Sequence, residues 1–197
     1  QPTEILEVGT YAGLSLIEIV KRIPNSKATA VDRWESYEDI NINLIKNQEV
    51  LKVKELYKSA NCLTSINQNK IEQIFNKNIK AAGLDNRIQS VKGDSHAVLL
   101  DFVKKDKLFD FIYVDGSHKC LDVVTDLFLS WQLLRNGGIM AIDDYMYTLE
   151  ADFNVNILEY PYHAVNAFLE KYKDNIIVLE RGYRIFIKKF HTPLEKV

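Results

Sequence analysis

Short apolar runs alternate along this chain with longer stretches in which apolar residues recur every three or four positions. A short run bounded by polar residues or glycine is typical of a buried strand, and the longer period is typical of a helix that buries one face. We therefore expect strands at residues 3–8, 28–31, 87–92, 109–114, 139–142, 176–179 and 183–188. Because strand and helix patterns alternate, the sequence predicts an α/β fold, with a seven-stranded, mainly parallel sheet and helices on both faces.

Helical periodicity follows the first, third and fourth of these strands and returns at residues 163–173. The connection between the second and third strands is unusually long. Its latter part, residues 65–82, carries apolar residues at helical spacing and would cover the sheet. Its earlier part, residues 35–62, is too long for a structureless loop, so we predict a helical insertion there. That insertion is either a lid or wall of a substrate site, or a helix pair that is merely an addition to the fold or forms an oligomer.

The composition is that of a soluble globular protein, since 47% of the 197 residues are hydrophobic and 26% are charged. This length fits a single domain over residues 1–197. A formal net charge of −2 offers no overall basic field to a nucleic acid, and no apolar run approaches the roughly 20 residues that span a membrane. Cys62 and Cys120 form neither a disulfide framework nor a zinc motif, so we expect reduced thiols in a cytoplasmic protein.

A glycine turn follows the first predicted strand. Residues 7–13 read Glu-Val-Gly-Thr-Tyr-Ala-Gly and precede an apolar helical pattern, so they predict a strand, a tight turn and a helix. Such a turn lets a nucleoside ligand lie against bare backbone, and the first N–H groups of the helix are free to bind it. The glycines are spaced G-x-x-x-G after an acid, whereas the dinucleotide fingerprint is G-x-G-x-x-G. The spacing therefore points away from NAD and towards S-adenosylmethionine (SAM).

Polar and mostly acidic residues follow five predicted strands, at the edge where ligands bind open parallel sheets. They are Glu7 and Gly9, Asp32, Gly93-Asp94-Ser95, Asp115, and Asp143-Asp144. A carboxylate at the position of Asp32 can accept both ribose hydroxyls of an adenosine. Trp34 can flank the adenine or belong to the core. Asp94 and Ser95 can bind the adenine edge, cap the following helix, or do both.

Three carboxylates come from two neighbouring strand ends: Asp115, Asp143 and Asp144. They would repel one another unless a cation lies among them, and oxygen ligands suit Mg²⁺. We therefore expect a magnesium site; in the alternative, one aspartate holds SAM and another caps a helix. His118 can take a proton from a substrate hydroxyl, or else cap the next helix or contact SAM. Nearby tyrosines either line an acceptor pocket or only pack: Tyr145, Tyr147, Tyr160 and Tyr162.

Four segments resemble a known enzyme family. Residues 6–15 look like motif I of methyltransferases of the catechol O-methyltransferase type, and residues 109–118 resemble the fourth-strand motif of a related bacterial group. That group, the methyltransferase domain 24 type, includes the methyltransferases of cephalosporin and macrolide-sugar biosynthesis. Residues 131–145 and the helix at 164–169 match the same group. The resemblance leaves out the insertion and implies the Rossmann-like fold of class I SAM-dependent methyltransferases.

The resemblance implies a role for each matching position. SAM would be bound by Glu7, Gly9, Thr10, Tyr11, Ala12, Gly13, Ser15, Asp32, Arg33, Trp34, Gly93, Asp94, Ser95, Asp115, Gly116 and His118. Asp115, Asp143 and Asp144 fall where this type binds Mg²⁺. Asp115 and His118 would be catalytic, because His118 falls where catechol O-methyltransferase carries its basic lysine and an imidazole can also serve as a base.

The implied activity is Mg²⁺-assisted methyl transfer from SAM to a hydroxyl of a small molecule such as a sugar, a phenol or a natural product. Two alternatives stay open: a metal-independent N-methyltransferase, and a scaffold that binds SAM without turnover. Family members usually carry helices before the first strand, whereas only four residues precede Ile5 here. We expect either that the insertion replaces those helices or that the chain, which lacks an initiator methionine, is a fragment or a processed chain.

Overall fold

The computed structural model describes residues 2–34, 71–147, 158 and 160–190. The predicted insertion at residues 35–62 lies outside this range, so its helices and its role stay predictions. Cys62 lies outside it as well, whereas Cys120 is a buried free thiol.

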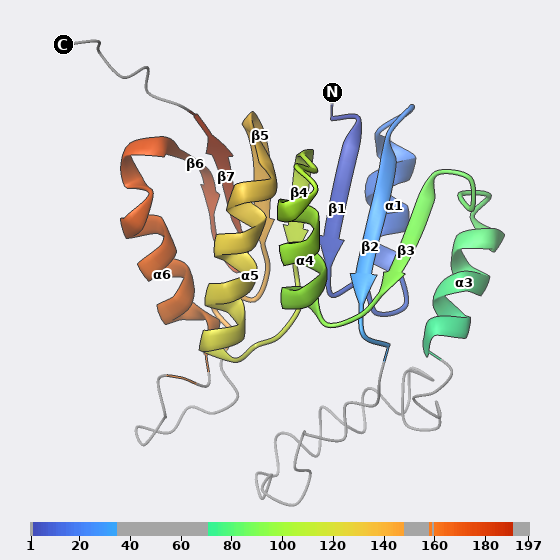
Figure 1. Cartoon of the computed structure of the whole chain (residues 1–197), viewed down its shortest axis with the longest axis horizontal. Coiled ribbons are helices and arrows are strands. Elements are labelled where there is room, and N and C mark those ends of the chain that lie inside the picture. The colour runs from blue at the N-terminus through green and yellow to red at the C-terminus, as the bar shows by residue number, and fades with distance from the viewer. Residues whose placement is uncertain (1, 35–70, 148–157, 159, 191–197) are drawn as a thin grey trace, which may run out of the picture.

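Seven strands form one sheet in the described part of the chain (Figure 1). They are β1 (Glu4–Val8), β2 (Lys27–Asp32), β3 (Ile88–Lys92), β4 (Phe109–Val114), β5 (Leu134–Ile142), β6 (Ile176–Arg181) and β7 (Ile185–Lys189). Their order across the sheet is β3-β2-β1-β4-β5-β7-β6. The first five strands in this order are parallel, and β7 pairs antiparallel with both β5 and β6. The predicted seven-stranded, mainly parallel sheet is therefore confirmed.

Helices lie on both faces of this sheet, as predicted (Figure 1). Those described are α1 (Leu14–Arg22), α3 (Ile71–Ala81), α4 (Ser95–Lys104), α5 (Cys120–Leu133) and α6 (Pro161–Lys171). One buried cluster joins α4, α5 and α6 to one face, and a second joins α1 and α3 to the other. The strand order reverses between β1 and β4, and in open α/β sheets a crevice for ligands forms at such a switch point.

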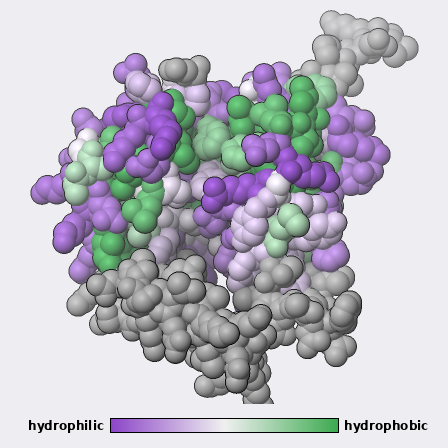
Figure 2. All heavy atoms as spheres, turned by 180° about the vertical axis from the view of Figure 1, so that it is seen from behind, coloured by the Kyte–Doolittle hydropathy of each residue, from purple (hydrophilic) through white to green (hydrophobic). Residues whose placement is uncertain are grey.

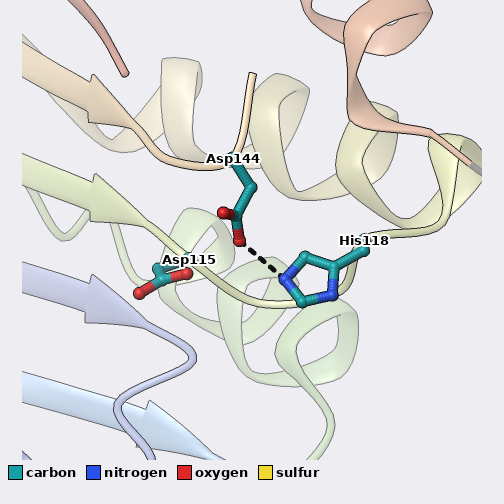
Figure 3. A group of neighbouring side chains, drawn as sticks. All are labelled: Asp115, His118 and Asp144. Carbon is teal, nitrogen blue, oxygen red and sulfur yellow. Dashed lines mark hydrogen bonds and ion pairs between the residues drawn. The ribbon is translucent and has the colours of Figure 1, made fainter. Parts of the chain in front are cut away.

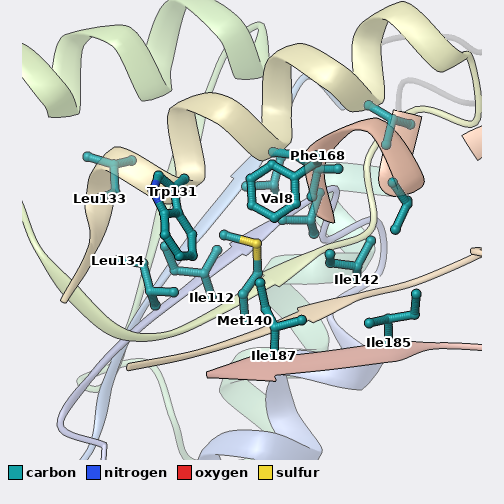
Figure 4. Close-up of a cluster of buried hydrophobic side chains, with 14 of the residues drawn as sticks. Val8, Ile112, Trp131, Leu133, Leu134, Met140, Ile142, Phe168, Ile185 and Ile187 are labelled. Atoms are coloured by element: carbon teal, nitrogen blue, oxygen red, sulfur yellow. The ribbon is translucent and has the colours of Figure 1, made fainter. Parts of the chain in front are cut away.

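The packing of the buried core fixes the positions of the strand ends relative to one another. Side chains alternate along each strand, so each face of the sheet receives its own apolar cluster. Under α4–α6, Met140 is fully buried among Trp131, Phe168 and Ile187 (Figure 4). Because such cores are packed as densely as organic crystals, the strands cannot slide past one another.

Strand β5 begins at Leu134, five residues before the predicted start at residue 139. It contains the pair Gly137-Gly138, and glycine pairs normally signal a loop. The structure explains this difference. Gly138 approaches β4 so closely that a Cβ atom on it would lie 3.0 Å from the carbonyl oxygen of Asp110. The pairing of β4 with β5 also shifts register between Phe109 and Phe111. Gly138 therefore permits a close contact between the strands, whereas nothing lies within 4 Å of a Cβ on Gly137.

Two helix boundaries also differ from the predicted ones. Helix α6 begins at Pro161, because proline is favoured in a first helical turn, where its missing N–H costs nothing. It ends at Lys171, and a 3₁₀ turn at Lys173–Asn175 follows. Helix α3 lies within the predicted range 65–82, of which residues 65–70 are not described.

Some apolar side chains stay at the surface. Seen from behind, hydrophobic residues of the described part lie between hydrophilic ones (Figure 2). Among the exposed ones are Ile177, Val178 and Leu179 of β6, which is an edge strand. None of the helices in the described ranges is long and apolar enough to cross a membrane.

Candidate functional site

The backbone holds the residues that follow four parallel strands at one level. Hydrogen bonds run from Gly9 N to Val31 O (2.9 Å), from Gly93 N to Asp32 O (3.0 Å), from Asp115 N to Val8 O (2.8 Å) and from Asp143 N to Val114 O (3.0 Å). Each donor is the first residue after its strand, so the sheet pairing continues one residue further. The predicted site residues are therefore brought together at the carboxyl edge, where parallel sheets bind ligands.

The two glycines of the turn after β1 are required by its geometry. Gly9 has a φ of +83°, and a Cβ atom on it would lie 2.0 Å from the carbonyl oxygen of Asp115. Gly13 has a φ of +81°, and its Cβ would lie 2.8 Å from the ring of Phe75. The turn after β1 therefore packs directly against the end of β4, and only glycine fits at this contact.

Glu7 lies fully buried beneath this turn. The hydroxyl of Ser15 donates to its Oε1, while its Oε2 has no hydrogen-bond partner in the described part of the chain. Burial raises the pKa of Glu7 to about 8, although the bond from Ser15 opposes this shift. Glu7 is therefore a largely protonated acid at neutral pH, and its Oε2 is buried without a partner among the described residues.

Helix α3 supplies a contact to the turn that the sequence analysis missed. The side-chain amide of Asn78 donates to the carbonyl oxygen of Ala12 at 2.9 Å. Thr10, between the glycines, is buried. No local pattern could have identified Asn78, because it lies far along the chain and meets the turn only through the packing of α3.

Asp32 connects the turn to the segment after β2. Its Oδ2 accepts from Tyr11 N and its Oδ1 from Trp34 N, both at 2.7 Å. The indole of Trp34 donates to the carbonyl oxygen of Tyr11 and packs on Phe75, with ring centroids 4.9 Å apart. Trp34 thus takes the core position that was one of its two interpretations. Its contact with adenine, the ribose contact of Asp32 and the SAM contact of the exposed Arg33 stay predictions.

The residues after β3 do cap a helix. Asp94 is the N-cap of α4 and accepts from Ala97 N at 3.3 Å. Ser95 opens the helix and donates a hydrogen bond to Asp126 of α5. Gly93 precedes them in contact with Val98, whose methyl group would lie 2.9 Å from a Cβ at that position. The capping interpretation is confirmed, and the adenine contact stays a prediction.

Asp115, His118 and Asp144 form a compact cluster at the ends of β4 and β5 (Figure 3). One ligand atom from each lies within 4.8 Å of the others, as a metal site requires. The imidazole Nε2 of His118 lies 2.6 Å from Asp144 Oδ2, and its ring stacks on Tyr147 with a centroid distance of 4.3 Å. Gly116, which follows Asp115, lies against Asp126 and could carry no side chain without displacing it.

The charges of this cluster are strongly coupled. Burial, followed by the charges of Asp143 and Asp144, raises the pKa of Asp115 to about 7. The hydrogen bond to Asp144 raises the pKa of His118 above its usual value, although burial opposes this. Burial alone would raise the pKa of Asp144, but bonds from His118 and Tyr183 outweigh it and leave this pKa low. Asp144 is therefore the ionised partner of an imidazole that protonates readily.

Asp143 has a different environment from the one predicted. Its Oδ2 accepts from the hydroxyl of Tyr113, and its Oδ1 accepts from Arg184 Nε and from Asp144 N, both at 2.8 Å. The positive charge of Arg184 thus offsets part of the repulsion among Asp115, Asp143 and Asp144. Metal binding by Asp143 stays a prediction, and His118 takes its place in the compact cluster.

The turn between β6 and β7 also contributes to the site, which the sequence analysis did not foresee. The hydroxyl of Tyr183 donates to Asp144 Oδ1 at 2.8 Å, next to the contact of Arg184 with Asp143. Tyr145 is buried and stacks on Tyr162 with centroids 5.0 Å apart. The only local sign of this contribution was that the turn after β6 is polar and aromatic. That pattern does not indicate which strand end the turn will face.

Comparison with known proteins places the chain in a family. A family model described as "Methyltransferase domain" matches residues 6–145, more than half of the chain. No curated protein matches it.

Several solved structures share the fold. The O-methyltransferase from Bacillus cereus in complex with SAH is 18% identical, with a TM-score of 0.64 over 95% of this chain and 74% of that chain. TomG, an O-methyltransferase from Streptomyces achromogenes involved in tomaymycin synthesis and solved with SAM, is 15% identical, with a TM-score of 0.60 over 97% and 74%. MycE, from the mycinamycin pathway and solved with Mg and SAH, is 16% identical, with a TM-score of 0.61 over 100% and 47%.

At 15–18% sequence identity, the similarity to these solved structures supports only the fold. The family model covers the turn after β1, the strand ends that carry Asp32, Asp94 and Asp115, and the acidic pair after β5. The chain therefore belongs to this family of SAM-dependent class I methyltransferases.

Proposed function

We propose that this protein transfers the methyl group of SAM to a hydroxyl oxygen of a small molecule. One observation carries the proposal: Gly9 packs against the carbonyl of Asp115, so the turn expected to hold SAM directly contacts the strand end that leads to His118. In this proposal the methyl donor, held by the turn, would lie next to His118 as the general base. Alignment of the two reactants is what an in-line displacement at an electrophilic methyl carbon mainly requires.

In this proposal the donor is held by three parts of the edge. The turn over residues 7–15, with the buried Glu7, binds the methionine part of SAM. Asp32 accepts from the ribose hydroxyls, because each carboxylate oxygen keeps a lone pair beyond its bond to backbone N–H. Asp94 and Ser95 face the adenine. SAM itself supplies an activated methyl group.

His118 is the proposed base. Asp144 accepts from the Nε2 side of the ring, which favours the tautomer with its hydrogen on Nε2 and leaves the Nδ1 lone pair to take the proton of the acceptor hydroxyl. Asp144 also stabilises the imidazolium that results. Since the pKa of His118 is raised, the base is active only above that raised value.

The acidic cluster fits a divalent cation, because two carboxylates and an imidazole converge within 4.8 Å. We propose Mg²⁺, held by Asp115 and Asp144, with Asp143 as the third carboxylate once its contact with Arg184 opens. Such an ion lowers the pKa of a bound hydroxyl. Pro161 of α6 also lines a small pocket beside these residues. With a volume of only about 10 Å³, this pocket admits a group of the size of the acceptor hydroxyl and not the whole acceptor.

A calorimetric titration of SAM into the purified chain, with Mg²⁺ and again with a chelator, tests the proposal first. We expect micromolar binding, and transfer of labelled methyl from SAM to vicinal-diol or phenol acceptors that weakens with chelator. Chelator-insensitive transfer to an amine would instead support a metal-independent N-methyltransferase. Binding without transfer to any acceptor would support a scaffold, and absence of SAM binding would refute all three.

A further inference from the structure

We propose that the guanidinium of Arg184 competes with a divalent ion for the carboxylate of Asp143. This competition sets the metal affinity of the site formed by Asp115, Asp143 and Asp144. The inference rests on the proposed function, because it takes the carboxylates after β4 and β5 as the metal site. It adds a residue from outside the parallel strands, and it assigns that residue a definite effect on ion binding.

The sheet register puts Arg184 in this position. Strand β7 pairs antiparallel with β5, and Ile185 lies opposite Ile142. One residue beyond this pair, Arg184 therefore faces Asp143 across the strand ends. The next pair along brings Tyr183 to Asp144, as the hydrogen bond between them shows. The contact follows from the fold and not from a chance side-chain orientation.

The carboxylate of Asp143 is already satisfied by protein groups. Its side chain is 7% exposed, whereas that of Arg184 is 55% exposed. Arg184 Nε donates to Oδ1 at 2.8 Å, the Tyr113 hydroxyl donates to Oδ2, and the guanidinium lies 5.9 Å from the centre of the Tyr113 ring. A carboxylate this deeply buried needs a compensating charge, and Arg184 provides it.

The other two carboxylates differ in this respect. Asp144 accepts from Tyr183 at Oδ1 and from His118 at Oδ2, and Asp115 accepts no side-chain hydrogen bond within the described residues. Neither is paired with an arginine in that part of the chain, and a neutral imidazole carries no charge that would oppose an ion. Asp143, by contrast, becomes a ligand only after the permanently charged Arg184 moves away. Two cations cannot share one carboxylate oxygen without strong repulsion, so arginine contact and ion binding at Asp143 exclude each other.

Such exclusion is a coupling between two equilibria, and couplings of this kind change affinity by roughly 5- to 150-fold. We expect Arg184→Gln to tighten divalent-ion binding about tenfold. Asp143→Asn should change the affinity less than about threefold in the parent, but weaken it about tenfold in the Arg184→Gln background, where Asp143 is released to the ion.

Mn²⁺ is a suitable probe, because it takes the same oxygen ligands and its free ion is counted directly by electron paramagnetic resonance. The full chain, Arg184→Gln, Asp143→Asn and the double variant are titrated with Mn²⁺ at one ionic strength. Arg181→Gln is the matched control, since it removes the same charge from the same hairpin but its guanidinium lies over Tyr145, 5.9 Å away, and not on a carboxylate. We expect its Mn²⁺ affinity to match the parent.

Unchanged or weaker Mn²⁺ binding in Arg184→Gln overturns the inference, as does an equal gain in Arg181→Gln, which would reflect net charge alone. Absence of Mn²⁺ binding in the parent and in every variant overturns it too. If Arg184→Gln fails to fold, Arg184→Lys should show a smaller gain, because an ammonium lacks the planar fork of the guanidinium. SAM titrations of the same samples separate the two proposals: failure to bind SAM refutes the proposed function, whereas SAM binding with unchanged Mn²⁺ affinity refutes only this inference.

Discussion

At the residue scale, left-handed backbone conformations gather at the candidate site. Tyr11, Trp34 and Asp144 all have positive φ angles, of 49°, 46° and 54°, and each follows the end of a parallel strand. For residues with a Cβ this conformation costs about 1–2 kcal/mol, so it persists only where surrounding contacts enforce it. Here the bonds of Asp32 to Tyr11 N and Trp34 N, and the bond from Asp144 N to Asp143 Oδ1, do so.

The contact between the turn and β4 gives a first prediction. Gly9→Ala should destabilise the fold by about 3 kcal/mol or more and abolish SAM binding, because its Cβ would clash with the backbone of Asp115. Gly137→Ala is the control: φ is +82° there as well, but nothing lies within 4 Å of a Cβ, so we expect about 1–2 kcal/mol. Urea unfolding measures both, and equal losses would refute the clash.

The buried Glu7 gives a second prediction. Its folded-state pKa of about 8 lies above the ordinary value of 4.5, so the folded state holds a proton that the unfolded chain releases between these pH values. Stability should therefore fall as pH rises through this window, and Glu7→Gln, which mimics the protonated acid, should remove that loss. Thermal unfolding at pH 5 to 8 tests this. Glu18→Gln, on the exposed surface of α1, should differ from the parent by a constant amount, and a constant difference for Glu7→Gln would contradict the prediction.

The imidazole of His118 gives a third prediction. As its pKa is raised, the neutral form needed for proton removal appears only above the usual value of 6.5, so the parent rate should rise with pH through that region. We expect His118→Asn to lower kcat by about 10²- to 10⁴-fold and to lose this acid limb, with little change in the KM for SAM. Rates over pH 5.5 to 9 measure it. A variant that kept the acid limb would assign the limb to another group.

At the element scale, an aromatic cluster joins α5 to α6 on one face of the sheet. The ring of Phe168 contacts those of Trp131, Phe128 and Tyr172, with centroids 5.1–5.8 Å apart. Edge-to-face and tilted pairs of this kind add to the burial of the rings themselves. The cluster therefore anchors α6, whose first residue, Pro161, lines the small pocket beside Asp115 and Asp144.

This cluster gives a fourth prediction. Phe168→Ala should lower the free energy of unfolding by about 3–5 kcal/mol, because a fully buried ring leaves a cavity. Leu121→Ala on α5 is the control: that side chain is 64% exposed, so we expect a change within about 0.5 kcal/mol. Urea unfolding compares them. A loss below about 1 kcal/mol for Phe168→Ala would mean that the core closes around the gap.

At the scale of the whole molecule, the sheet couples the donor site to folding. SAM would contact the ends of β1, β2 and β3, all of which are absent from an unfolded chain. Saturation at about 100 times the Kd should stabilise the fold by about 2.7 kcal/mol and raise Tm by about 5–10 °C. Differential scanning calorimetry with and without SAM measures the shift. An unchanged Tm at a concentration that calorimetric titration shows to be saturating would mean that the unfolded chain binds SAM equally well.

Much of the fold could be predicted because its signals are local. The seven strands follow from short apolar runs. The residues after four parallel strands are held at one level by sheet pairing, so the strand ends named most residues of the candidate site. Strand boundaries could not be predicted where a residue type occurs both in turns and at close contacts between strands, as glycine does. The predicted strand began at residue 139, after Gly137 and Gly138, because sequence does not show that Gly138 lies against β4.

By itself, the sequence determined the strands, the glycine turn after Glu7, the acidic residues at the strand ends and the family. These features depend on backbone geometry within a few residues, which periodicity and spacing record directly. Only the tertiary structure decided that Asn78 holds the turn, that Trp34 packs on Phe75, and that Arg184 and Tyr183 meet the acidic pair. Those contacts join distant segments through helix packing and antiparallel register, and no local pattern specifies which partner a side chain will face.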